Sequence, residues 1–205
     1  MISIEHKCIF VHIPKNAGTS IESVIWPEER SESQLWMGFV DKYHNKYQTG
    51  GLQHLLAKQI RQEVGEQIFS DFFKFTIVRN PWDKAVSQFS YMSKRKDLRE
   101  FCRLSDSADF KTYLQAITKV KHVQWMPQVD FILDDEGNPL VDFIGRFESL
   151  DIDVSKIFNK LNITSTLPHI NQGNRDSYHQ FYDEESKGMV AELFSKDIAY
   201  FNYQF

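Results

Sequence analysis

The chain has 205 residues and a formal net charge of -4, with 24 basic and 28 acidic side chains. Because no basic stripe runs along it, the composition argues against a surface that binds nucleic acid through phosphate contacts. The length fits one α/β domain, and no linker rich in proline, glycine or serine divides it.

The sequence also argues against a membrane protein and a metalloprotein. It has no leader-like amino end and no apolar stretch of about 18 residues, so we expect a soluble protein. Cys8 and Cys102 fall in an expected strand and an expected helix, outside any zinc or redox spacing, which favours reduced thiols and a cytoplasmic location. The seven histidines form no ligand motif, so we expect no metal site.

The stretch 8–26 predicts a buried strand, a tight loop and an α-helix. A proline ends the apolar run, and Gly18 lets the backbone pass close to a bound group. Thr19 and Ser20 favour a helix start, where unpaired N–H groups and the helix dipole attract an anion. Lys15 adds a full positive charge, so the loop predicts a cradle for a phosphate-like group.

This loop differs from the nucleotide P-loop G-x-x-x-x-G-K-[ST], because Lys15 precedes Gly18 and the first glycine is missing. The residues PKNAGTS after an apolar strand resemble instead the 5′-phosphosulfate loop of sulfotransferases. The resemblance implies 3′-phosphoadenosine 5′-phosphosulfate as the sulfuryl donor. A strand-to-helix turn with an exposed lysine is the alternative.

The polar segment 27–51 is either a functional loop that shapes an acceptor pocket or a solvated excursion. Apolar residues at intervals of three and four then predict an amphipathic helix over 52–64. His54 falls in its first turn, off the apolar stripe, where the helix dipole favours the neutral imidazole that a general base needs. A surface or capping histidine is the alternative.

A second strand is predicted over 73–78, followed by a helix with Pro81 at its first position. Arg79 then lies at the carboxyl end of a strand, where open parallel sheets bind ligands, and its guanidinium can hold a phosphate. Ser87 could add a hydroxyl from the helix. A structural salt bridge from Arg79 to Asp83 would explain the arginine equally well.

The residues VRNPWDKAVSQF resemble the 3′-phosphate motif of sulfotransferases, in which a serine follows the arginine by eight residues, as Ser87 follows Arg79. Both motifs occur in the family's order, each after an apolar strand. His54 lies between them, where carbohydrate-type members of the family place their base.

The rest of the sequence predicts helices within 94–126 and a hairpin or strand pair formed by 129–133 and 140–147. GRFESLD, residues 145–151, resembles the end of a further core strand in carbohydrate-type sulfotransferases. Two more amphipathic helices follow, the last capped by Asp183.

In the loop before that last helix, Asn171, Arg175 and Tyr178 could close over a nucleotide phosphate. The R-K-G loop that small-molecule cytosolic sulfotransferases use on the 3′-phosphate is absent, and Arg175 is its candidate substitute.

The whole pattern predicts a single sulfotransferase-like domain over 1–205, with a three-layer P-loop-like α/β fold, a central, mainly parallel sheet and helices on both faces. The resemblance implies metal-free sulfuryl transfer from 3′-phosphoadenosine 5′-phosphosulfate to a hydroxyl, most plausibly on a saccharide. The implied catalytic residues are Lys15 and His54. The implied donor-binding residues are Lys15, Asn16, Ala17, Gly18, Thr19, Ser20, Arg79, Ser87 and Arg175.

Two alternative functions agree less well with the sequence. A nucleotide kinase on the same plan is disfavoured by the position of Lys15 and by the lack of an acidic strand end for magnesium. A nucleotide-binding module without activity is disfavoured by the presence of Lys15, His54, Arg79 and Ser87 together.

Overall fold

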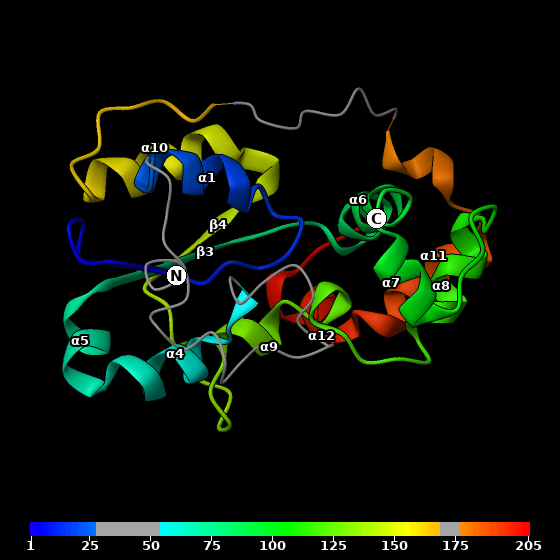
Figure 1. Ribbon diagram of the computed structural model, residues 1–205, viewed down its shortest axis with the longest axis horizontal. Coiled ribbons are helices and arrows are strands. Elements are labelled where there is room, and N and C mark those ends of the chain that lie inside the picture. The colour runs from blue at the N-terminus through cyan, green and yellow to red at the C-terminus, as the bar shows by residue number, and fades with distance from the viewer. Residues whose placement is uncertain (28–53, 169–176) are drawn as a thin grey trace. The chain divides into compact units, whose positions relative to one another are not determined.

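The computed structural model of the chain describes residues 1–27, 54–168 and 177–205 (Figure 1). The chain divides into two compact units. The first unit comprises residues 1–78 and 128–172, and the second comprises 79–127 and 173–205.

The first unit is built on a sheet that, in the described residues, has four strands in the order β1-β2-β3-β4. β1 (Ile2–Ser3) pairs antiparallel with β2 (Cys8–Phe10). β2, β3 (Phe73–Val78) and β4 (Phe143–Arg146) are parallel. The sheet is therefore mainly parallel, as predicted, and the carboxyl ends of β2, β3 and β4 share one edge.

Helices cover both faces of this sheet within the first unit (Figure 1). One face carries α1 (Gly18–Ile25) and α10 (Leu150–Lys160), which the turn η3 (Phe147–Ser149) joins to β4. The other face carries α4 (Ala57–Val64), α5 (Glu66–Asp71) and the short α9 (Val129–Ile132). The first unit thus has the mixed α/β architecture that the sequence predicted.

Aromatic and aliphatic side chains fill the core between the sheet and the helices α1 and α10. Phe10 and Phe75 are buried and stack with their ring centroids 5.0 Å apart. The apolar stripes of the two helices and neighbouring strand residues complete this cluster: Ile21, Ile25, Ile77, Val154, Ile157, Phe158 and Leu161. Burial of these stripes, spaced three and four residues apart, accounts for the packing of both helices on the sheet.

The second unit is helical in the residues described. Its elements are α6 (Pro81–Met92), α7 (Lys96–Cys102), α8 (Phe110–Ile117), η2 (Val123–Trp125), η4 (Tyr178–Phe181), α11 (Glu184–Leu193) and α12 (Ser195–Phe201).

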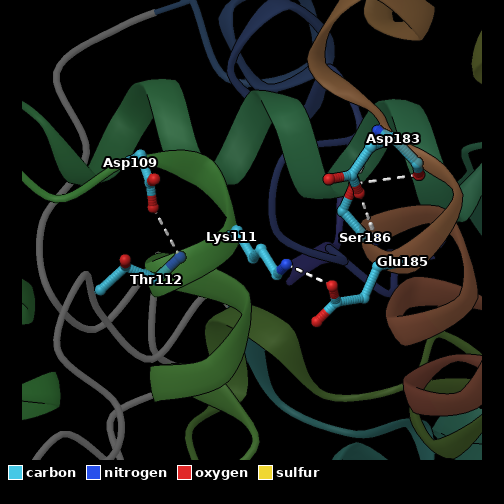
Figure 2. Close-up of polar contacts among 6 residues, drawn as sticks. All are labelled: Asp109, Lys111, Thr112, Asp183, Glu185 and Ser186. Atoms are coloured by element: carbon cyan, nitrogen blue, oxygen red, sulfur yellow. Dashed lines mark hydrogen bonds and ion pairs between the residues drawn. The ribbon is translucent and has the colours of Figure 1, made fainter.

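Aspartate caps define the starts of α8 and α11 (Figure 2). Asp109 accepts a hydrogen bond from the backbone N–H of Thr112 at 2.8 Å, and Asp183 accepts one from the N–H of Ser186 at 2.7 Å. Each cap satisfies an N–H that the first helical turn leaves without a carbonyl partner. The predicted cap at Asp183 is therefore confirmed. An ion pair between Lys111 of α8 and Glu185 of α11 links the two helices.

The prediction of a strand over 129–133 was wrong, because most of this segment forms α9. The side chain of Asp134 accepts hydrogen bonds from the N–H groups of Glu136 and Asn138. This tight turn leaves a single bridge between Leu133 and Pro139 instead of a hairpin. The later strand does form, as β4, but its partner is β3. A short, largely apolar run of this kind does not distinguish a strand from a buried helical turn.

The predicted helix over 52–64 begins later, at Ala57. The side chain of Gln59 accepts a hydrogen bond from the backbone N–H of Leu56 at 2.9 Å, which fixes the helix start at this point. His54 therefore precedes the helix instead of lying in its first turn, and residues 52 and 53 lie outside the described residues. The helix-dipole argument for a neutral His54 does not apply in this position.

Phe75→Ala should lower the free energy of unfolding by about 3 to 5 kcal/mol, because it removes a buried ring from a stacked pair and leaves a cavity. Urea denaturation would measure this change. Ile4→Ala is the control, since the Ile4 side chain is 66% exposed, and it should change stability by less than about 0.5 kcal/mol. Equal effects of the two substitutions would contradict this description of the core.

Candidate active site

The loop between β2 and α1 has a strained backbone. Lys15 and Ala17 both have positive φ angles, 68° and 61°, although neither is glycine. Such left-handed conformations cost about 1 kcal/mol or more each and persist where the surroundings impose them. Alternation of left-handed and other conformations turns successive backbone N–H groups toward one point, which is the geometry of an anion-binding nest.

The side chain of Asn16 holds this loop against the first unit. Its Nδ2 donates hydrogen bonds to the backbone oxygen of Ile77 and to Oε1 of Gln128, each at 2.7 Å, and the side chain is almost fully buried. Asn16 therefore connects the loop to the end of β3. The Asn16 side chain acts as an anchor, so only its backbone N–H is suited to the predicted contact with a donor.

The amino end of α1 follows directly. Ala17 is the N-cap and has no side chain able to cap the helix, and the first turn contains no acidic residue. The dipole of α1 and its first-turn N–H groups therefore keep their attraction for an anion. Lys15 is half-buried and Thr19 is exposed, whereas Gly18 and Ser20 are buried. Lys15 and Thr19 are thus the side chains of the loop that a ligand can reach most easily.

His54 is buried, and one of its contacts identifies the ring nitrogen that carries a proton. Its Nδ1 lies 3.0 Å from the backbone oxygen of His12. A carbonyl oxygen only accepts hydrogen bonds, so Nδ1 carries the proton. The neutral ring then has its lone pair on Nε2, which is the state required of a general base.

His12 brings His54 to the start of α1. The two imidazole rings meet edge to face, with centroids 4.6 Å apart. A Cβ placed on Gly18 would lie only 1.8 Å from Nε2 of His12, so the His12 ring abuts the backbone of Gly18. One imidazole thus separates the predicted base from the predicted cradle. This contact, and not a positive φ angle, explains the glycine.

Sequence reasoning missed His12 and its partner Glu22. Oε1 of Glu22 lies 2.5 Å from Nδ1 of His12, and both side chains are buried. The available signal was the position of Glu22 beside Ile21 and Ile25, on the face of the helix that enters the core. A buried carboxylate requires a partner, and that requirement could have led to His12.

The second unit contains Arg79 and Ser87. Nε of Arg79 donates a hydrogen bond to Oδ2 of Asp83 at 2.7 Å, so the salt bridge left open by the sequence is present. Asn80 caps α6 through the N–H of Trp82, and Pro81 occupies the first helical position, as predicted. Ser87 lies on the buried side of α6. The predicted strand end and helix start are therefore confirmed, while the phosphate contacts of Arg79 and Ser87 stay predictions.

Lys84 is a buried cation on α6 that the sequence analysis did not identify. Its Nζ lies 3.5 Å from the backbone oxygen of Gln124 and 5.4 Å from the ring centroid of Phe194. The pKa of Lys84 is lowered from 10.5 to about 8, mainly because the ammonium group is buried; the charge of Asp197 opposes this shift and the charge of Arg79 adds to it. Lys84 thus adds a buried, positively charged side chain to α6, whose first turn follows Arg79.

Other predicted residues lie outside the described part of the chain. These are Asn171, Arg175 and most of the loop 27–51. Tyr178 is described, and its ring stacks on His179 with centroids 4.0 Å apart. In residues 1–27, 54–168 and 177–205, no group of three or more histidine, cysteine, aspartate or glutamate side chains is arranged to hold a metal ion. None of the helices described is both long and apolar enough to cross a membrane.

A mainly parallel α/β sheet, a strained loop that leads into an uncapped helix start, and a buried histidine in contact with His12 fit a group-transfer site. Comparison with known protein families matches residues 1–204 to the sulfotransferase family. The chain therefore belongs to the sulfotransferase family, and the family prediction from the sequence is confirmed.

The chain was also compared with individual proteins and with solved structures. An uncharacterized protein from Archaeoglobus fulgidus is 30% identical over 134 residues, which are 60% of this chain and 97% of that protein. No solved structure matches the chain significantly.

The pH dependence of stability should report the burial of Lys84. The folded-state pKa is about 8 and the ordinary value is 10.5, so the unfolded chain binds the proton more tightly. The contribution of Lys84 to stability should therefore rise by about 3 kcal/mol as the pH rises from 7 to 10.5.

Urea denaturation of the wild type and of Lys84→Met across this pH range would measure this rise. The free energy of unfolding of the wild type should increase with pH relative to that of Lys84→Met. Lys84→Gln is the control for packing, because it also lacks the ammonium group and should give a curve parallel to that of Lys84→Met. Parallel curves for all three proteins would contradict the assignment.

Proposed function

We propose that this protein transfers a sulfuryl group from 3′-phosphoadenosine 5′-phosphosulfate to a hydroxyl of an acceptor, with a saccharide as the acceptor class. One observation carries the proposal: His54, protonated on Nδ1, is separated from the start of α1 by the single ring of His12. A base and an anion cradle are thus held together, as transfer between two oxygens requires.

The cradle fits the 5′ end of this donor. The left-handed Lys15 and Ala17, the uncapped start of α1 and the absence of acidic residues from its first turn all favour a dense negative charge. We infer that the contacts come from the Lys15 ammonium group, the Thr19 side chain and backbone N–H groups of the loop. The residues of this contact set are Lys15, Asn16, Ala17, Gly18, Thr19 and Ser20.

The 3′-phosphate is assigned to Arg79 and Ser87, with Arg175 as a further contact. Arg79 keeps its ion pair with Asp83 through Nε, and a guanidinium has further donors with which it can bind a phosphate. The Asp83 pair would then orient the guanidinium. The support for this assignment is the spacing of the family motif and the position of Arg79 one residue after β3.

In the proposed mechanism Nε2 of His54 accepts the proton of the acceptor hydroxyl as the oxygen attacks sulfur. The Nδ1 hydrogen bond to His12 keeps this lone pair in place and stabilises the charge that the ring acquires. Lys15 and the N–H groups of the loop stabilise the negative charge that develops on the departing phosphate oxygen. The charge of Lys15 and the α1 dipole serve this role without a metal ion.

The proposal also includes a single sulfotransferase domain over 1–205 with a three-layer P-loop-like plan. Helices on both faces of the sheet in the first unit support that plan. A cytoplasmic location is proposed because Cys8 and Cys102 are both free thiols.

Lys15→Ala and His54→Ala should each lower kcat about a hundredfold or more, through loss of charge stabilisation and of the base respectively. The assay is transfer of isotopically labelled sulfate to a panel of saccharide, lipid and phenolic acceptors, followed by mass spectrometry of the products. Lys58→Ala and His179→Ala are matched controls and should retain full activity. Unchanged turnover of His54→Ala would remove the base assignment.

Arg79→Ala should weaken binding of 3′-phosphoadenosine 5′-phosphate about tenfold or more, because it removes charge-assisted hydrogen bonds. Calorimetry would measure the change in Kd. Arg61→Ala removes an exposed arginine paired with Glu66 and should leave the Kd unaltered.

The same nucleotide separates the alternatives in a thermal-shift experiment. Stabilisation by 3′-phosphoadenosine 5′-phosphate without magnesium supports a sulfotransferase, whereas stabilisation by magnesium and ATP alone supports a kinase. Nucleotide binding without any labelled product would indicate a binding module.

A further inference from the structure

We propose that Glu22 and His12 form a positioning pair that holds the general base His54 at a fixed position relative to the phosphosulfate cradle, the loop between β2 and α1. This inference deepens the proposed function and rests on it. His12 itself does not react: it connects two parts of the site through its ring and its backbone.

The ring of His12 is fixed from three sides. Oε1 of Glu22 lies 2.5 Å from its Nδ1, its Nε2 end abuts Gly18, and Phe10 stacks on its face with centroids 5.2 Å apart. Gly18 and Glu22 are four residues apart, so they lie on the same face of α1 and together hold one imidazole. The ring therefore has one orientation relative to the helix start.

The protonation of this pair follows from its geometry. Glu22 is buried, with a side chain 5% exposed, and a buried carboxylate requires a hydrogen donor or an opposite charge close by. Nδ1 of His12 lies 2.5 Å from Oε1 of Glu22, so the contact is favourable when this nitrogen, and not Nε2, holds the proton of the ring. The Nε2 end of the same ring lies against Gly18. In this proposal His12 positions the base and does not itself take the proton of the acceptor.

The backbone of His12 transmits the position of the ring to His54. Its carbonyl oxygen accepts the Nδ1 hydrogen of His54 at 3.0 Å, and its ring contacts the edge of His54. A displaced His12 ring would shift this carbonyl and weaken the contact that keeps the His54 proton on Nδ1. Part of the His54 population would then carry its proton on Nε2, where it cannot act as a base.

The test uses the full chain with nitrogen-15-labelled histidine, with His54→Ala to assign the His54 signals. Nitrogen NMR reports which ring nitrogen carries the proton, and it does so without any catalytic activity. We expect the Nδ1-protonated form in the wild type and a mixture of both forms in Glu22→Ala. The kcat of Glu22→Ala should fall about tenfold or more, with little change in the KM for the donor, as for other residues that orient a catalytic histidine.

Glu22→Gln separates position from charge. Its amide oxygen can take the place of the carboxylate oxygen beside His12 Nδ1, so both the His54 signal and the kcat should return toward the wild type. Glu22→Gln as impaired as Glu22→Ala would overturn the positioning role in favour of a purely electrostatic one.

Gly18→Ala displaces the His12 ring without altering Glu22, and it covers the case in which Glu22→Ala does not fold. The new Cβ would lie 1.8 Å from Nε2 of His12, whereas at Gly188 of α11 a Cβ meets nothing within 4 Å. Gly18→Ala should therefore change the His54 signal and Gly188→Ala should not.

An unchanged His54 signal in Gly18→Ala would overturn the inference. If the signals change as expected but the wild type transfers no sulfate, the positioning pair stands and the proposed function fails.

Discussion

The two hydrogen bonds donated by the Asn16 carboxamide hold the rest of the site in place. They join the loop that leaves β2 to the backbone of Ile77 in β3 and to Gln128 just before α9. β2 and β3 are parallel, so these bonds connect two segments that end at the same edge of the sheet. The strained backbone at Lys15 and Ala17 persists because the anchored loop cannot relax toward ordinary angles. The anchored loop thereby fixes the orientation of the amino end of α1, the positive end of its dipole, relative to the sheet.

The site is organised by backbone and buried side chains to a greater extent than by exposed ones. His54 is oriented by a carbonyl oxygen, and the ring of His12 is oriented by the helix whose start forms the cradle. Base and cradle are consequently parts of one rigid arrangement, although 42 positions separate His12 from His54 in the chain. Such preorganisation reduces the rearrangement that a substrate must induce when it binds.

Much of this arrangement could be predicted from the sequence, because it depends on local patterns. The short apolar strands, the lysine and glycine of the loop, Pro81 at a helix start and the Asp183 cap each have a signature in neighbouring residues. The partners of Asn16 and the pairing of His12 with Glu22 depend on tertiary packing, which spacing does not encode. The replacement of a predicted strand by α9 has a different origin: a short, largely apolar run does not distinguish a strand from a buried helical turn, and the local turn at Asp134 prevents a hairpin.

The contact between His12 and Gly18 also constrains how the chain can vary. Any side chain at position 18 would occupy the volume that the imidazole now fills. A relative with alanine there would need a shorter residue at position 12, and the carboxylate at position 22 would then lose its contact with the imidazole and be less favourable in the core. Positions 12, 18 and 22 should therefore change together during evolution, as a steric and electrostatic unit.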